Sequence, residues 1–146
     1  MSEHLFNIRI QFYGIFSLIL CLSDSLGYAF LFFKEFLMTR ILEIRAYNLK
    51  PGTRDTLHDL FISRALPMLQ RWGVDVVAYG PSLGEEDSYY LMRSYASLED
   101  RQQSQDAFYG SDEWRQGPRE PIIALIHSYT NAVIEVDDAT LQGLRR

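Results

Sequence analysis

The sequence predicts an α+β domain in which a four-stranded antiparallel sheet carries two helices on one face. The first observation is the order of periodicities along the chain, which alternates as strand, helix, strand, strand, helix, strand. The second is size, since 146 residues with 47% apolar content suffice for one packed domain and are few for two. Helices on one face leave the other face of the sheet to solvent or to a partner.

The first predicted strand begins at Leu42 and ends at the turn Pro51-Gly52. Its side chains alternate in character, with Leu42, Ile44 and Ala46 on one face and Glu43, Arg45 and Tyr47 on the other. We expect the apolar face to join the core. The polar face then carries the side chains that are candidates for binding or catalysis.

A long amphipathic helix follows, because apolar residues recur at spacings of three and four from Leu57 to Trp72. Thr53 is the expected N-cap and Gly73 the expected left-handed terminating residue. Pro67 conflicts with a helix interior, since it removes one backbone hydrogen bond. It predicts a bend or break near residues 63–66.

The remaining elements complete a ferredoxin-like order. Two strands, residues 75–79 and 89–96, are joined by an acidic loop, and Ser97 caps a second helix that runs toward Tyr109. Residues 117–121 interrupt the chain, and 129–137 form the last strand. The tail from residue 138 to 146 is expected to be a polar extension.

The second face of the sheet is expected to be rich in aromatic and charged side chains. We predict that two such faces pair in a homodimer around an enclosed pocket. The residues assigned to this face are Glu43, Arg45, Tyr47, Tyr89, Arg93, Tyr95, Tyr129 and Asn131.

Charge and cysteine content exclude several classes of protein. The formal charge of −5 disfavours nucleic acid and anionic membrane as partners, because both are bound by basic surfaces. Cys21 is the only cysteine, which excludes an intramolecular disulfide and indicates a reducing, cytoplasmic setting. No glycine-rich phosphate loop or metal-ligand cluster is present in the sequence, so we expect no cofactor and no metal.

Residues 1–37 differ from the rest of the chain. Two apolar runs, 12–22 and 26–33, flank Asp24, which would lie near the centre of a membrane-spanning helix at a cost of about 2.5 to 3.5 kcal/mol. A membrane anchor is therefore one interpretation, and an over-extended reading frame with Met38 as the biological start is the favoured one. The predicted domain covers residues 38–137.

An ordered set of short motifs resembles the NIPSNAP family across residues 41–136. The motifs are Glu43-Ile44-Arg45-Ala46-Tyr47, Lys50-Pro51-Gly52, Arg71-Trp72-Gly73, Tyr95-Ala96-Ser97-Leu98 with Arg101, and Asp112-Glu113-Trp114. The resemblance implies a dimeric α/β barrel, in which two ferredoxin-like sheets pack around an interior pocket. It leaves the activity undefined.

Two functions from different classes remain. The first is binding of a small organic molecule between the sheets, and the alternative is a cofactor-independent monooxygenase or isomerase acting on an aromatic or polyketide-like substrate. The pocket or interface candidates are Glu43, Arg45, Tyr47, Tyr79, Arg93, Tyr95, Trp114, His127 and Tyr129.

Each candidate also has a structural interpretation. Glu43 and Arg45 are expected to form a cross-strand or interface ion pair more readily than a catalytic pair. His127 is a haem ligand, an acid–base group or an ordinary residue at a strand edge, the last being favoured, and His58 is expected to be exposed to solvent. No catalytic residue is assigned from the sequence.

Overall fold

The computed structural model describes residues 39–145. The expectations for residues 1–37, the membrane anchor and the alternative start, lie outside this range. Four strands form one antiparallel sheet in the order β2-β3-β1-β4. The strands are β1 (Thr39–Leu49), β2 (Asp75–Pro81), β3 (Ser88–Tyr95) and β4 (Ile126–Asp137). This is the predicted α+β, ferredoxin-like arrangement, and β1 and β3 are its central strands.

The helix after β1 is interrupted where the proline predicted an irregularity. It consists of α2 (Arg54–Leu60), a π-helical segment (Phe61–Ala65) and α3 (Leu66–Arg71). Pro67 lies in the first turn of α3, where its missing N–H costs least, so the widened turn lies directly before it. Gly73 is left-handed as predicted, with φ of 70°.

The expected N-cap position at Thr53 is confirmed, although no hydrogen bond from its side chain caps the helix. Its hydroxyl instead donates to the carbonyl of Lys50.

A run of short helices leads from β3 to β4. They are α4 (Leu98–Gly110), α5 (Asp112–Gln116) and α6 (Arg119–Ile123). The predicted cap at Ser97 is confirmed, since its hydroxyl accepts the backbone N–H of Asp100. Ser111 caps α5 in the same way through the N–H of Trp114.

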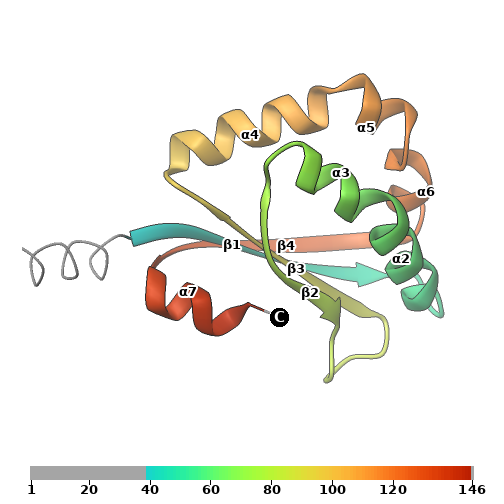
Figure 1. The fold of residues 1–146 in the computed structure, drawn as a ribbon. Coiled ribbons are helices and arrows are strands. Elements are labelled where there is room, and N and C mark those ends of the chain that lie inside the picture. The colour runs from blue at the N-terminus through green and yellow to red at the C-terminus, as the bar shows by residue number, and fades with distance from the viewer. Residues whose placement is uncertain (1–38, 146) are drawn as a thin grey trace, which may run out of the picture. The chain divides into compact units, whose positions relative to one another are not determined.

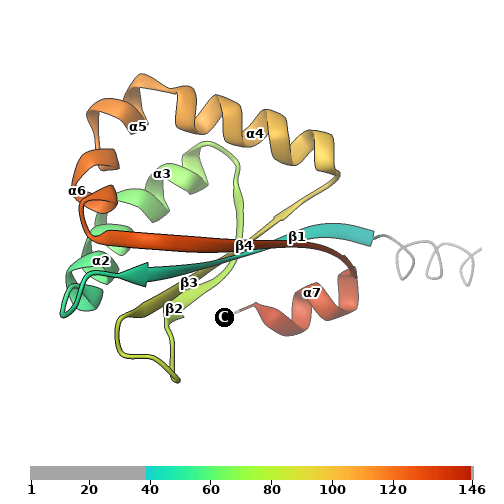
Figure 2. The same cartoon turned by 180° about the vertical axis from the view of Figure 1, so that it is seen from behind.

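The main core lies between the sheet and helices α2 to α6. Tyr89 and Leu91 of β3 pack there against Phe61 of the π-helical segment, Phe108 of α4 and Trp114 of α5. Figure 1 shows α3 and α4 on the same side of the sheet, and Figure 2 shows this arrangement from behind. Both predicted helical segments therefore cover one face.

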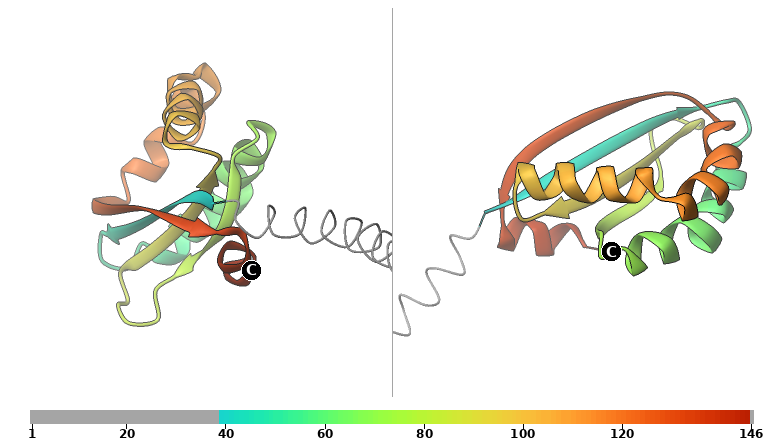
Figure 3. Two further views of the ribbon diagram at one scale, coloured as in Figure 1. Left: turned by 90° about the vertical axis from the view of Figure 1, so that its left-hand side faces the viewer. Right: turned by 90° about the horizontal axis from the view of Figure 1, so that it is seen from above.

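The C-terminal segment differs from the expected polar extension. It forms α7 (Asp138–Leu144), capped by Asp137, and Leu141 is buried against Leu42 and Val77 on the second face of the sheet. The left view of Figure 3 shows α4 above the strands and α7 below them. Two apolar residues on one face of an otherwise polar segment are too few to predict a buried helix, so the sequence did not indicate this contact.

The two faces of the sheet are reversed relative to the prediction. Glu43, Tyr89, Arg93 and Tyr95 are buried, and they point to the helix-covered face. Leu42 and Ile44 point to the second face, with α7. The alternation identified the two sets of side chains correctly, but the charged set is the one beneath the helices.

Within residues 39–145, no helix is long and apolar enough to cross a lipid bilayer.

Candidate functional site

A carboxylate lies at the centre of the helix-covered face. Glu43 of β1 is directly opposite Arg93 of β3 in the antiparallel register, and Arg45 follows two residues later on the same face. Arg93 Nη2 donates to Glu43 Oε2 at 2.9 Å, and Arg45 Nη2 donates to Glu43 Oε1 at 2.8 Å. The expected ion pair between Glu43 and Arg45 is therefore present, although it lies within one chain.

Helix α4 supplies the next layer of contacts. Arg101, Gln105 and Tyr109 are spaced four residues apart and so lie on one side of the helix, above the sheet. Arg101 Nη2 donates to Glu43 Oε1 at 3.2 Å, and the amide of Gln105 donates to Glu43 Oε2. The Tyr109 hydroxyl accepts from Arg45 Nη1 at 3.2 Å and from Arg93 Nη1 at 3.0 Å.

These contacts determine the charge of the cluster. Burial by itself would raise the pKa of Glu43, but the positive charges of Arg93 and Arg45, with hydrogen bonds from Arg101 and Arg45, outweigh it and lower the pKa to about 2. Glu43 is thus ionised at neutral pH and is unsuited to act as a general base. Three guanidinium groups share one carboxylate, which leaves two positive charges in the cluster.

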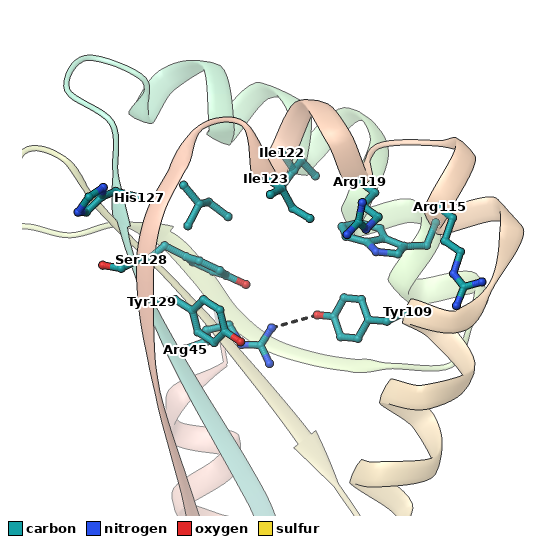
Figure 4. A pocket seen from close by; sticks show the side chains of 12 residues that line it. Arg45, Tyr109, Arg115, Arg119, Ile122, Ile123, His127, Ser128 and Tyr129 are labelled. Atoms are coloured by element: carbon teal, nitrogen blue, oxygen red, sulfur yellow. Dashed lines mark hydrogen bonds between the residues drawn. The ribbon is translucent and has the colours of Figure 1, made fainter.

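A cavity of about 1030 Å³ lies beside this cluster, between the sheet and helices α4 to α6. Its walls come from five elements, and Figure 4 shows the side chains that line it. The lining residues are Arg45 and Tyr47 of β1, Tyr109 of α4, Trp114 and Arg115 of α5, Arg119, Ile122 and Ile123 of α6, and Ile126, His127, Ser128 and Tyr129, which belong to β4.

The walls of this cavity combine aromatic rings with guanidinium groups. The guanidinium carbon of Arg45 lies 5.0 Å from the ring centroid of Tyr129, and the rings of Tyr47 and Tyr129 are 6.2 Å apart. Burial raises the pKa of Tyr47 to about 12, so its phenol is neutral and remains a hydrogen-bond donor. Trp114 is buried, whereas Arg115, Arg119 and Tyr129 are exposed and lie at the mouth of the cavity.

The structure separates the nine candidates into three groups. Five of them, Arg45, Tyr47, Trp114, His127 and Tyr129, line the cavity. Glu43, Arg93 and Tyr95 lie buried in and around the charge cluster. Tyr79 packs in the main core, with its ring centroid 4.9 Å from that of Phe61.

His58 and His127 occupy different environments. His58 is half-buried rather than exposed, because its Nδ1 forms a hydrogen bond of 2.8 Å with the Tyr89 hydroxyl. His127 is exposed, and in Figure 4 its imidazole lies across β4 from Tyr109 and Arg115. Residues 39–145 hold no group of three metal-binding side chains.

Sequence reasoning missed several residues of the cavity wall, chief among them Tyr109, Arg115 and Arg119. Two signals pointed to them. Tyr109 follows Arg101 by two steps of four residues on one side of a helix, and Arg115 and Arg119 flank the helix-breaking Gly117-Pro118 at a separation of four.

The family of the chain follows from its match to a family model. The NIPSNAP model matches residues 42–134, well over half of the chain. The chain belongs to the NIPSNAP family. The resemblance inferred from the motifs is thereby confirmed, and the match covers β2, β3, most of β1 and β4, and every residue of the cavity wall.

Solved structures of NIPSNAP proteins share this fold. A NIPSNAP family protein from Agrobacterium tumefaciens is 21% identical with a TM-score of 0.62, covering 68% of this chain and 87% of its own. A second A. tumefaciens NIPSNAP family protein, described as of unknown function, is 19% identical with a TM-score of 0.64, covering 69% and 91%.

An uncharacterized NIPSNAP-like domain protein from Burkholderia xenovorans is 21% identical with a TM-score of 0.61, covering 65% of this chain and 83% of its own. No curated protein matches the chain. At these identities the NIPSNAP relatives support the fold only. The ligand and the chemistry have to be inferred from the cavity.

Proposed function

We propose that this NIPSNAP protein binds a small organic molecule in the cavity between the sheet and helices α4 to α6. The observation that carries the proposal is the cavity of about 1030 Å³, walled by aromatic and branched apolar side chains with a few convergent polar groups. Binding sites for small molecules are typically concave, about 300 to 1,000 Å³ in volume, and lined in this way. The cavity is formed by one chain and not between two sheets.

The two tryptophans of the chain provide a direct test. Trp114 lines the cavity and Trp72 does not, so a ligand in the cavity should shift the indole N–H resonance of Trp114 alone. We would titrate isotope-labelled full-length protein with 2-naphthoate, 2-naphthyl phosphate and 2-naphthamide, and assign the two signals with Trp72→Phe. If none of the three compounds moves the Trp114 signal, the proposal fails.

A matched pair of isoleucines locates the binding site by calorimetry. Ile123 on α6 lines the cavity and is 45% exposed, whereas Ile62 in the π-helical segment is 43% exposed and lies outside the lining. Ile123→Trp should fill part of the cavity and weaken binding of the naphthalene compounds about tenfold or more. Ile62→Trp should leave it unchanged, and equal losses in both variants would contradict a site in the cavity.

A cofactor-independent monooxygenase or isomerase is the second candidate, and the phenols of Tyr47 and Tyr109 at the cavity wall favour it. A neutral phenol held by a guanidinium group is a competent proton donor to a developing oxyanion. Oxygen uptake with simple quinols, abolished in Tyr109→Phe, would support turnover. Binding of quinols without oxygen uptake or isomerisation would leave binding as the function.

We also propose that the chain forms a homodimer through the second face of its sheet. On this face Ile134 is 45% exposed, and Ile44 and Met92 are half-buried beside the part that α7 covers. Ile134→Glu should dissociate the dimer in light scattering, because it would bury a charge in an apolar interface. The neighbouring Val133→Glu, on the helix-covered face, is the control. A wild-type monomer at micromolar concentration would contradict the proposal.

The cytoplasm is the compartment that we propose for this protein. The single cysteine of the sequence supports a reducing environment. Fractionation of cells that express the full chain would test it, and recovery in the membrane fraction would contradict it.

A further inference from the structure

The charged groups in the wall of the cavity are all cationic. Arg45, Arg115 and Arg119 belong to the lining, and no aspartate or glutamate of residues 39–145 does. Two of these arginines have carboxylate partners that lie outside the lining, since Glu43 bonds Arg45 within the charge cluster and Glu120 pairs with Arg119 in the exposed region of α6. The cavity therefore offers positive charge to its contents without an internal counter-ion.

Arg45 is only partly neutralised by its own partner. Glu43 accepts hydrogen bonds from Arg45, Arg93 and Arg101 together, so one negative charge is divided among three positive ones. The side chain of Arg45 is 12% exposed, which means that water screens its charge weakly. An additional anion beside Arg45 would lower the electrostatic energy of the whole cluster.

Hydrogen-bond donors also exceed acceptors at this end of the cavity. The oxygen of Tyr109 accepts from two guanidinium groups, which can only donate. Its own O–H then needs an acceptor, and none occurs among the hydrogen bonds of residues 39–145. The buried Nε of Arg45 also has no partner within this range. A half-buried hydroxyl without an acceptor at the cavity wall favours a ligand rich in oxygen atoms.

Helices α5 and α6 bring apolar side chains to the cavity wall besides Arg115 and Arg119. Trp114, Ile122 and Ile123 lie on α5 and α6, and Figure 4 shows the two isoleucines across the cavity from Arg45 and Tyr129. A ligand that fits both parts carries an aromatic or aliphatic body at one end and negatively charged oxygens at the other.

We propose that the cavity selects organic oxyanions, compounds in which a carboxylate or phosphate group binds Arg45 and Tyr109 while an apolar body packs against Trp114 and the isoleucines of α6. This proposal rests on the proposed function and narrows it to a class of ligand. Arg115 and Arg119 at the mouth attract the anion, whereas Arg45 and Tyr109 bind it directly.

Calorimetry on the full chain with 2-naphthoate, 2-naphthyl phosphate and 2-naphthamide separates the two proposals. The three compounds share an apolar body and differ in the polar group, so their affinities isolate the contribution of charge. We expect at least one of the two anions to bind about tenfold or more tightly than the amide at low salt, and this preference to fall as salt rises. The preferred anion distinguishes a carboxylate from a phosphate ligand.

Variants then assign the preference to residues. Arg45→Gln and Tyr109→Phe should reduce the ratio of anion to amide affinity to about threefold or less. Arg45→Gln also disturbs the buried cluster, so a variant at the exposed mouth gives an independent test. Arg115→Gln should lower the association rate of the anion. Arg64→Gln, an exposed arginine outside the cavity lining, is the charge-matched control and should change neither.

Three outcomes would overturn the inference in different ways. If the amide binds as tightly as both anions and shifts Trp114, the cavity binds small molecules but does not select oxyanions. If none of the three compounds binds, the proposed function fails together with the inference. A preference for anions that is equally sensitive to Arg64→Gln would also contradict it.

Discussion

Glu43 and Arg93 face each other across the two central strands and form an ion pair that is almost entirely removed from solvent. Their relative exposures are 0% and 1%, and Arg93 Nη2 lies 2.9 Å from Glu43 Oε2. A buried pair of this kind is costly to break, because the partner that remains keeps its charge without compensation. The pair therefore links the stability of the sheet to the electrostatics of the neighbouring cavity.

Replacement of Glu43 by glutamine should destabilise the fold strongly. The change removes the carboxylate that Arg45, Arg93 and Arg101 share, and we expect a loss of about 3 to 5 kcal/mol in the free energy of unfolding. Urea denaturation of the two proteins measures it. The exposed pair of Arg71 and Glu113 supplies the control, since Glu113→Gln should leave stability nearly unchanged. Equal losses in both variants would contradict the role of burial.

Acid should weaken the wild-type protein more than the Glu43→Gln variant. The pKa of Glu43 is about 2 in the folded chain against its ordinary value of 4.5, so the pair stabilises the fold fully above pH 4.5. This stabilisation is lost as the pH falls from about 4.5 to 2, and it amounts to about 3 kcal/mol. Denaturation curves at several pH values should show the stability difference between the proteins narrowing over this range. A constant difference would contradict the lowered pKa.

Gly73 and Gly110 should respond oppositely to the same substitution. At both positions the space that an alanine Cβ would occupy is free of other atoms within 4 Å, but Gly73 has a positive φ of 70° and Gly110 does not. Gly73→Ala should cost about 1 to 2 kcal/mol because the left-handed conformation strains a Cβ atom. Gly110→Ala, in the last residue of α4, should be neutral or stabilise by up to about 1 kcal/mol. Thermal unfolding of both variants tests the difference.

Leu141 should contribute to stability despite its place near the end of the chain. It is 1% exposed and packs with Leu42 and Val77, so Leu141→Ala should cost about 2 to 5 kcal/mol. Leu83, which is fully exposed in the loop between β2 and β3, is the matched control, and Leu83→Ala should change stability by less than about 0.5 kcal/mol. A neutral Leu141→Ala would show that α7 is detached from the sheet in solution.

The order of elements could be predicted because the spacing of apolar residues within each segment distinguishes helices from strands. The π-helical irregularity before Pro67 and the left-handed Gly73 followed from the properties of single residues. The orientation of the faces could not be predicted, since alternation gives two sets of side chains without saying which set is covered. Glu43 is buried only because Arg93 and Arg101, 50 and 58 residues away, compensate its charge.

The candidate site was predictable in part for a related reason. Arg45, Tyr47 and Tyr129 were identified from strands whose polar side chains stand out against an apolar pattern. Arg115 and Arg119 lie in short helices around Gly117-Pro118, a segment whose pattern indicated only a break in the chain. Their convergence on one cavity depends on the way this segment returns to β4, which no local pattern describes.

The strand β4 has a consequence for how the protein behaves at high concentration. It is twelve residues long, pairs within residues 39–145 with β1 only, and is exposed along almost all of its length. The opposite edge strand, β2, has seven residues and ends at Pro81, which limits its pairing with other chains. Strand-to-strand addition between copies, and with it fibre formation or precipitation, should therefore begin at β4, and a lysine placed along that edge should raise the solubility of the protein.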